Sequence, residues 1–232
     1  MVRIGKNRVH LQMASLPAFA VLFDWDGVVI DSSRHHQLSW ELLAKETGNS
    51  ISNEQFWESF GQQNKTIIPN LLGWAQDPQE IESLSLRKES LYRDLLKDKG
   101  ISPLDGVVPL VSALKEAGIP RVVGTSSARE NIETALEVMK LEGFFDDVVA
   151  AADVEHGKPH PEVFLNAADR ARTAPEMCVV IEDSHHGLQA ARAGGMKSVG
   201  VLSSHSREKL SEADLIVSSM TEISPEVLAS LF

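Results

Sequence analysis

Short apolar runs alternate with longer amphipathic stretches along most of this chain. The apolar runs, which are typical of buried strands in a parallel sheet, lie at residues 18–23, 121–124, 147–151, 178–181, 198–201 and 215–217. Apolar residues recur with a helical period in the stretches between them, at residues 107–117, 128–140, 161–171, 185–193 and 225–231. This alternation predicts an α/β fold in which helices cover both faces of a parallel sheet.

Residues 32–102 interrupt the alternation with helical patterns alone. The helix signals are a run over 33–47 closed by Gly48, a capping box of Ser52 and Gln55 with a stop at Gly61, a run over 67–72, and an Asp77 cap on a helix that ends at Gly100. The side chains expected inside this helical block include Leu38, Leu42, Leu43, Trp57, Phe60 and Trp74.

The position of the helical block predicts how the chain is divided. Because the block follows the first strand directly, we expect it to lie over the carboxyl edge of the sheet as a cap. The predicted division is a core of residues 17–31 and 103–232 and a cap of residues 32–102. Residues 1–16 are expected to form a loose extension, in which Met13 is an alternative start to Met1.

Two carboxylates, Asp24 and Asp26, follow the first apolar run directly. Residues two apart on an extended backbone point the same way, so both side chains are expected to face one volume at the carboxyl end of the strand. At ~4 Å two such charges repel by roughly 4 kcal/mol at an effective dielectric of 20, which favours a hard divalent cation between them. The alternative is a solvated turn, since Asp and Gly are ordinary turn residues.

Polar residues also follow three later elements of the predicted sheet. Thr125, Ser126 and Ser127 end one strand, and Ser127 with Glu130 forms a capping box, so this segment predicts either a phosphate cradle or a plain helix cap. A single lysine, Lys158, stands in a proline-containing turn, where it is either a phosphate ligand or a solvated surface residue. Two acids, Glu182 and Asp183, emerge from an apolar run, and buried acids require a cation.

Composition narrows the possible partners and compartment. The formal net charge of -11 argues against nucleic acid and anionic membrane, because either partner needs a basic face. The one cysteine, Cys178, lies in an apolar run and is interpreted as a buried, inert thiol, which suits a reducing, cytoplasmic compartment. No segment of the sequence approaches the ~20 apolar residues that a membrane helix requires.

The order and spacing of these segments resemble the haloacid dehalogenase superfamily. The resemblance rests on four motifs, DWDGVVIDS, VVGTSS, GKPHPEVF and VVIEDSHHGLQAARAGGM, and extends over residues 21–220. It implies a Rossmann-like core, a helical cap between the first two motifs, and Mg²⁺-dependent phosphoryl transfer through an aspartyl-phosphate. Relatives that act on other bonds lack the second aspartate of the first motif, so Asp26 points to phosphate chemistry.

The resemblance also implies a role for each polar residue of the motifs. Asp24 is the expected nucleophile, because a carboxylate with an ordinary pKa near 3.9 is already ionised at neutral pH. Asp26 is the expected general acid and base, and we expect nearby carboxylates to raise its pKa. The expected Mg²⁺ ligands are Asp24, Asp183, Glu182 and the main-chain carbonyl of Asp26. The expected phosphoryl ligands are Thr125, the N–H of Ser126, and Lys158.

The histidines are expected to play different parts. Hard Mg²⁺ prefers oxygen ligands, so His185 and His186 are interpreted as exposed or locally hydrogen-bonded rather than metal-binding. His35 is expected at the surface. For His36, similar helical caps suggest a position close to the leaving group, where it would contact substrate or place a proton.

The helical insertion is most similar to the β-phosphoglucomutase-like branch, which contains phosphatases and a sugar-phosphate mutase. The mutase holds a second phosphate with a cap arginine, and Asn64 stands at that position here, followed by Lys65. An amide cannot replace a bidentate guanidinium on a dianion, so we favour a phosphatase of a small phosphorylated metabolite, in the sugar or polyol phosphate class. The protein is expected to be a monomer. A β-phosphoglucomutase-type mutase and a non-catalytic phospholigand-binding module are the alternatives.

Overall fold

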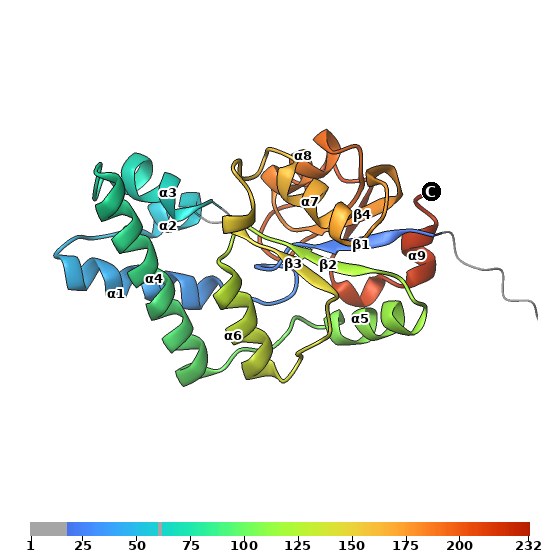
Figure 1. Ribbon diagram of the computed structural model, residues 1–232, viewed down its shortest axis with the longest axis horizontal. Coiled ribbons are helices and arrows are strands. Elements are labelled where there is room, and N and C mark those ends of the chain that lie inside the picture. Colours follow the sequence, from blue (N-terminus) through green and yellow to red (C-terminus); the bar gives the residue numbers. More distant parts are fainter. Residues whose placement is uncertain (1–17, 60–61) are drawn as a thin grey trace, which may run out of the picture.

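A parallel sheet forms the centre of the molecule (Figure 1). The computed structural model describes residues 18–59 and 62–232, and within these ranges the sheet has six strands in the order β3-β2-β1-β4-β5-β6. The strands are β1 (Ala20–Phe23), β2 (Arg121–Gly124), β3 (Asp147–Val149), β4 (Cys178–Glu182), β5 (Lys197–Val201) and β6 (Leu215–Val217). All of their pairings are parallel, as the apolar runs predict.

The strand order reverses next to β1, which pairs with β2 on one side and β4 on the other. In this register Phe23 lies beside Val123 and Ile181, and the N–H of Asp24 still donates to the carbonyl of Ile181 at 2.9 Å. The residues that follow these three strands therefore meet at one point of the sheet edge, which is where open α/β sheets bind ligands.

Side-chain alternation along β1 divides the core into two layers. Val21 and Phe23 pack in one layer with helices α5 (Val107–Glu116), α6 (Arg129–Met139) and α9 (Pro225–Ala229). Ala20 and Leu22 pack in the other with α7 (Glu162–Arg170) and α8 (His185–Ala193). Figure 1 shows these two helix layers on opposite faces of the sheet. Short 3-10 turns lie at η2 (Ala151–Asp153), η3 (Pro175–Met177) and η4 (Met220–Glu222).

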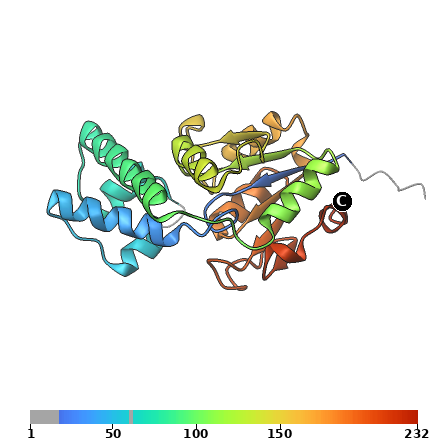
Figure 2. The same cartoon turned by 90° about the horizontal axis from the view of Figure 1, so that it is seen from below.

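The helical block lies beyond the carboxyl ends of the strands, at the left of Figure 1. It consists of α1 (Ser33–Thr47), α2 (Asn53–Ser59), α3 (Asn64–Thr66), the π-helical η1 (Ile67–Leu72) and α4 (Pro78–Lys99). Helices α1 and α4 pack side by side, as Figure 2 also shows, and α4 reaches α6 of the core. The block has its own apolar cluster around Trp40, Phe56 and Ile68, and we refer to it as the cap.

The helices of the cap begin and end where the capping residues in the sequence predict. Ser52 and Gln55 exchange hydrogen bonds between side chain and backbone N–H, and the carboxylate of Asp77 accepts from the N–H groups of Gln79 and Glu80. Gly48 ends α1 in the left-handed region, at φ 71°. These boundaries depend on residues close in sequence, which is why the pattern predicts them well.

Two predicted cap-core residues are instead exposed. Leu42 is 39% exposed and Trp57 is 50% exposed. Leu42 is next to the buried Leu43, and Trp57 is next to the buried Phe56. Adjacent residues on a helix point about 100° apart, so only one residue of each pair faces the interior. Trp74 packs edge-on against Trp40, in agreement with the prediction.

Several predictions lie outside the described residues. These are the loose extension at residues 1–16, the alternative start at Met13, the inward Phe60 and the helix stop at Gly61. The division into a core of 17–31 and 103–232 and a cap of 32–102 stays a prediction, although the helical elements fall within the cap limits. Cys178 is fully buried as predicted, and burial, with Glu176 adding to it, raises the pKa of its thiol to about 12.

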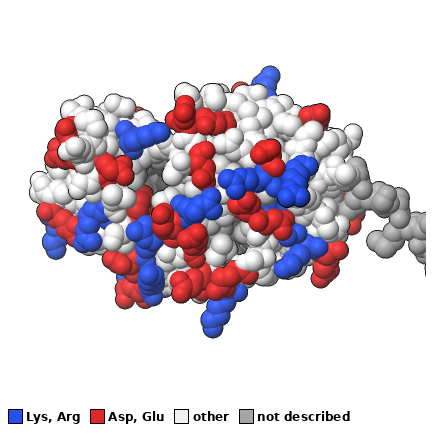
Figure 3. Space-filling model, in the orientation of Figure 1, with Lys and Arg blue, Asp and Glu red and all other residues white. Residues whose placement is uncertain are grey.

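The surface shows no gathering of one charge on the face drawn in Figure 3. Lys and Arg side chains lie among Asp and Glu side chains on this face. Among residues 18–59 and 62–232, every helix is too short or too polar to cross a membrane.

Candidate active site

A cavity of about 650 Å³ lies between the carboxyl ends of the strands and the cap. Core and cap both contribute to its wall, and all predicted site residues line it. They are Asp24, Asp26, His36, Asn64, Thr125, Ser126, Lys158, Glu182 and Asp183. The prediction that strand ends and cap enclose one volume therefore agrees with the structure.

Three buried carboxylates converge at the floor of this cavity. Asp24, Glu182 and Asp183 are 8%, 0% and 2% exposed, and each offers an oxygen within 4.8 Å of the others. Lys158 reaches into this carboxylate cluster, and its Nζ donates to Oδ1 of Asp24 and to Oε1 of Glu182, both at 2.7 Å. The sequence allowed either a surface or a phosphate-binding position for Lys158, and the structure buries it among the acids.

Charge in the carboxylate cluster is incompletely balanced by the protein. Three carboxylates and one ammonium leave two formal negative charges in a buried volume. Burial, with Glu182 adding to it and Lys158 opposing it, raises the pKa of Asp24 to about 7, and burial with Glu182 and Asp24 raises that of Asp183 well above its ordinary value. The pKa of Asp24 is therefore higher than the ordinary value that we expected. A further cation beside Asp24 would stabilise its charged form.

The donor set fits a hard divalent cation. Oδ2 of Asp183 is buried and has no hydrogen-bond partner among the described residues, which is unfavourable for a carboxylate unless an ion takes that place. Both oxygens of Glu182 are engaged, Oε1 by Lys158 and Oε2 by the N–H groups of Asp183 and Ser184. The available oxygens therefore come first from Asp183 and Asp24, and all are of the type that Mg²⁺ prefers.

Gly27 allows the first motif to approach the carboxylate cluster. Its φ is +82°, and a Cβ at this position would overlap Oδ2 of Asp183. We expect Gly27→Ala to destabilise the protein beyond the ~1–2 kcal/mol of a left-handed non-glycine residue, because a buried carboxylate must also move. The matched control is Gly118→Ala, since Gly118 has a φ of +71° and open space around it. Urea unfolding measures the loss of unfolding free energy in both variants. Equal losses would show that the contact with Asp183 does not affect stability.

Asp26 has partners of its own on the cap side of the cavity. Ser127 Oγ donates to its Oδ2 at 2.6 Å, His36 Nε2 lies 3.3 Å from its Oδ1, and Ser32 also donates to Oδ1. Burial acts to raise the pKa of Asp26, but the interaction with His36 and the two serine hydrogen bonds outweigh it and hold the pKa well below its usual range. The expected upward shift is thus wrong, because hydroxyl and imidazole groups surround this carboxylate more closely than other acids do.

The Thr125 segment does not cap the helix that follows it. Helix α6 begins at Arg129, and its N-cap residue is Ala128 with no side-chain cap, so the predicted capping box of Ser127 and Glu130 is wrong. Ser127 uses its hydroxyl for Asp26 and its N–H for Oγ1 of Thr125 at 3.1 Å. Thr125 is buried and Ser126 is half-buried at the cavity wall, which suits the phosphoryl contacts expected of them.

A buried lysine of the cap, Lys88, escaped the sequence prediction. Its Nζ lies 2.8 Å from Nδ1 of His36 and donates to Oε1 of Glu89 at 3.0 Å. An ammonium can only donate, so Nδ1 of His36 accepts and Nε2 carries the proton that faces Asp26. Lys88 occupies the apolar stripe of α4 between Leu84 and Leu91, and a charged residue at that spacing was the available signal.

Glu89 joins the cap to the core, and it too escaped prediction. It accepts from Nδ2 of Asn64 at 2.7 Å and from Nδ2 of Asn131 in α6. Arg93 donates to the side-chain oxygen of Asn131 at 3.1 Å. Asn64 is therefore part of a polar contact between cap and core, while the neighbouring Lys65 donates to the carbonyl of Glu155 at 3.3 Å.

The remaining histidines lie close to where they were expected. His185 contacts the side chain of Gln189 at 2.8 Å, and His186 is exposed. His35, predicted at the surface, is instead half-buried, with Nε2 3.0 Å from the carbonyl of Gly100, because the end of α4 covers it.

Comparison with known proteins agrees with this geometry. The sequence profile of haloacid dehalogenase-like hydrolases matches residues 21–201. The chain belongs to this family. It is a hydrolase of that family, and the expected Rossmann-like fold with a helical cap is confirmed. A β-phosphoglucomutase from Clostridium difficile superposes on it with a TM-score of 0.82 at 26% identity, over 93% of this chain and 97% of that one.

Two curated relatives of this family member are named phosphatases. A chloroplastic 5-amino-6-(5-phospho-D-ribitylamino)uracil phosphatase from Arabidopsis thaliana is 34% identical over 88% of this chain, which spans only 55% of that relative's length. A fructose-1-phosphate phosphatase from Escherichia coli K12 is 33% identical over 78% of this chain and 95% of the relative.

Proposed function

We propose that this hydrolase is a Mg²⁺-dependent phosphatase of small phosphomonoesters, which acts through an aspartyl-phosphate on Asp24. The observation that carries the proposal is the buried carboxylate cluster of Asp24, Glu182 and Asp183, with Lys158 inside it, at the floor of the cavity. A phosphate ester placed there meets a nucleophile, a cation site and an ammonium together, which is the arrangement that phosphoryl transfer needs.

The carboxylate cluster and the first motif would hold the metal. The proposed ligands are Asp24, Asp183 and the main-chain carbonyl of Asp26, with Glu182 orienting the site through its backbone hydrogen bonds. When bound, Mg²⁺ supplies positive charge for the carboxylates and for the phosphoryl oxygens. Lys158, Thr125 and the N–H of Ser126 are proposed to hold the remaining phosphoryl oxygens.

The first half-reaction transfers the phosphoryl group to the protein. An oxygen of Asp24 forms a bond to phosphorus as the bond to the leaving oxygen breaks, and Asp26 delivers a proton to that oxygen. We propose that this proton is relayed from Nε2 of His36, which lies 3.3 Å from Oδ1 of Asp26, while Nζ of Lys88, 2.8 Å from Nδ1 of His36, supplies the replacement proton. In the second half, Asp26 takes a proton from a water molecule as its oxygen forms a bond to phosphorus. The bond between phosphorus and the Asp24 oxygen breaks, which releases phosphate and restores the Asp24 carboxylate, and the proton on Asp26 returns along the same path.

The cap favours a phosphatase over a mutase. At the position where the mutase carries an arginine, the Asn64 amide is bound to Glu89, and Lys65 is turned to the carbonyl of Glu155. Neither group is a bidentate partner for a second phosphate. We therefore expect free phosphate from β-glucose 1-phosphate with a trace of the bisphosphate, and glucose 6-phosphate without free phosphate would favour the mutase.

The substrate class is proposed from the cavity and the relatives. A cavity of about 650 Å³ with polar groups from both core and cap suits a small hydroxylated ester, and the named relatives include a fructose-1-phosphate phosphatase. The test is phosphate release from p-nitrophenyl phosphate with Mg²⁺ and with a chelator, followed by a screen of sugar and polyol phosphates. A non-catalytic binding module would release no phosphate under either condition.

Removing the proposed acid should separate the two half-reactions. In Asp26→Asn, we expect turnover of an alkyl phosphate to fall by about 10²–10⁴-fold, because the alkoxide cannot leave without its proton. p-Nitrophenolate leaves unprotonated, so the same variant should release a burst of one nitrophenolate per chain and then stall as the acyl phosphate. Rapid-mixing absorbance measures the burst, and undiminished turnover of the alkyl ester would refute the assignment.

A further inference from the structure

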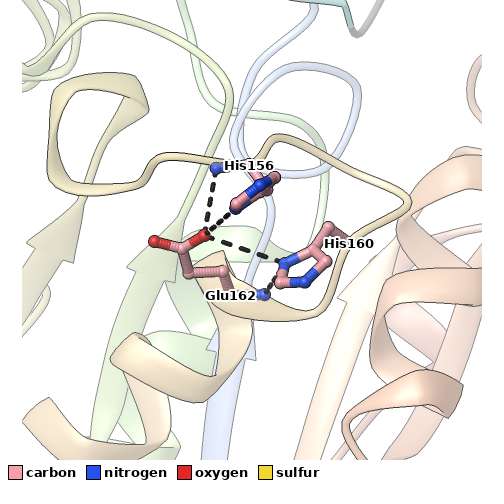
Figure 4. Close-up of side chains that lie close together, drawn as sticks. All are labelled: His156, His160 and Glu162. Atoms are coloured by element: carbon pink, nitrogen blue, oxygen red, sulfur yellow. Dashed lines mark hydrogen bonds and ion pairs between the residues drawn. The ribbon is translucent and has the colours of Figure 1, made fainter.

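A second group of metal-binding side chains lies outside the cavity, on the loop before α7. His156, His160 and Glu162 each offer an atom within 4.8 Å of the other two. Nδ1 of His156 is 3.2 Å from Oε2 of Glu162, and Nδ1 of His160 is 3.7 Å from the same oxygen. Figure 4 shows the two rings and the carboxylate directed toward one another at the start of the helix.

Two of these spacings are close to the edge length of a tetrahedral metal site. Zinc–nitrogen and zinc–oxygen bonds of about 2.0–2.1 Å place neighbouring tetrahedral ligands about 3.3 Å apart. The observed distances of 3.2 and 3.7 Å, both measured to Oε2 of Glu162, lie close to this value, and the ligand atoms of the two histidines lie within 4.8 Å of each other. The two histidine side chains are 63% and 51% exposed, so an ion can enter from solvent and keep a water molecule as its fourth ligand.

The carboxylate of this group is already held in place by the backbone. Its Oε1 accepts from the N–H of Glu155 at 2.9 Å, and its Oε2 accepts from the N–H of His156 at 3.0 Å. These hydrogen bonds also lower the pKa of Glu162, so the group is ionised throughout the neutral range. A ligand that is fixed and charged before the ion arrives loses less conformational entropy on binding.

The ligand types distinguish this group from the carboxylate cluster. Asp24, Glu182 and Asp183 present oxygen alone, which suits Mg²⁺, whereas two imidazoles and one carboxylate suit Zn²⁺ and its neighbours among the transition metals. When Mg²⁺ and a transition metal are both present, the carboxylate cluster and the histidine group can therefore bind different ions.

We propose that His156, His160 and Glu162 form a second cation site, selective for Zn²⁺ or a similar transition metal over Mg²⁺. The three residues flank Lys158, whose ammonium enters the carboxylate cluster, and the same loop accepts a hydrogen bond from Lys65 of the cap at the carbonyl of Glu155. An ion bound here would connect the residues on either side of Lys158. It would thereby fix the loop of residues 155–162, which contacts both the active site and the cap.

Zinc titration of the tag-free full chain tests this site. Isothermal calorimetry with Zn²⁺ in saturating Mg²⁺ should show one site per chain, and His160→Gln and His156→Gln should each weaken it by at least about tenfold. His186→Gln is the matched control, because it removes an exposed histidine outside the group and should leave the affinity unchanged. Circular dichroism establishes that each variant is folded.

Two further measurements locate the ion. Asp183→Asn should retain zinc binding, because this site does not depend on the carboxylate cluster or on the proposed phosphatase activity. Zn²⁺ should also slow amide hydrogen exchange over residues 155–162 in the wild type and not in His160→Gln. If the heat of zinc binding persists in both His→Gln variants but disappears in Asp183→Asn, the ion binds in the cavity and the proposal is overturned. Absence of zinc binding in saturating Mg²⁺ would also overturn it.

Discussion

Asp24→Asn is expected to abolish phosphate release, with a fall in turnover of at least about 10⁴-fold for any phosphomonoester. An amide keeps the shape of the side chain but is too weak a nucleophile to attack phosphorus. Release of phosphate measured with p-nitrophenyl phosphate and with a sugar phosphate tests this prediction.

The same substitution should leave the fold intact. Asp24 is one of three acids around a single ammonium, so its neutralisation removes repulsion from Glu182 and Asp183 as well as attraction to Lys158. The matched control is Asp31→Asn, which makes the same change at an exposed residue seven positions along the chain and should keep full activity. If Asp24→Asn turns over at a rate near the wild type, the aspartyl-phosphate mechanism is wrong.

The fold could be predicted largely from local patterns. Each strand is a short apolar run, and the polar residues that follow β1, β2 and β4 must meet because parallel strands end at one edge. The convergence of Asp24, Thr125 and Glu182 is therefore contained in the order of the segments. The positions of caps such as Asp77 follow from residues within one turn, which also makes them predictable.

The partners within the site could not be predicted, because they depend on contacts between distant segments. Ser127 looks like the first half of a capping box, yet its hydroxyl binds Asp26, 101 residues away. The pKa of Asp26 moves in the opposite direction from the expected one for the same reason, since His36 and Ser127 approach it only after the cap and core have packed. The spacing of Lys88 in α4 indicates an inward position, but its partners depend on packing, because its ammonium lies over the rings of Trp40 and Tyr92.

Lys158→Met should both destabilise the protein and weaken catalysis. Methionine is similar in length, but it leaves the buried acids of the carboxylate cluster without their ammonium, and removing one partner of a buried ion pair typically costs about 3–5 kcal/mol. Turnover should fall by about 10²–10³-fold as well, because Lys158 is proposed to stabilise charge on the phosphoryl oxygens. Urea unfolding in a chelator measures the first effect, and phosphate release measures the second.

Mg²⁺ should rescue the stability of Lys158→Met more than it stabilises the wild type. Without the ammonium, the carboxylates of Asp24, Glu182 and Asp183 attract a divalent cation more strongly, so the rise in Tm on adding Mg²⁺ should be larger in the variant. Lys197→Met is the control, because Lys197 forms a half-exposed pair with Asp214 at 3.4 Å that is worth at most about 1 kcal/mol. Equal Mg²⁺-induced shifts in Lys158→Met and wild type would mean that lysine and cation do not share these carboxylates.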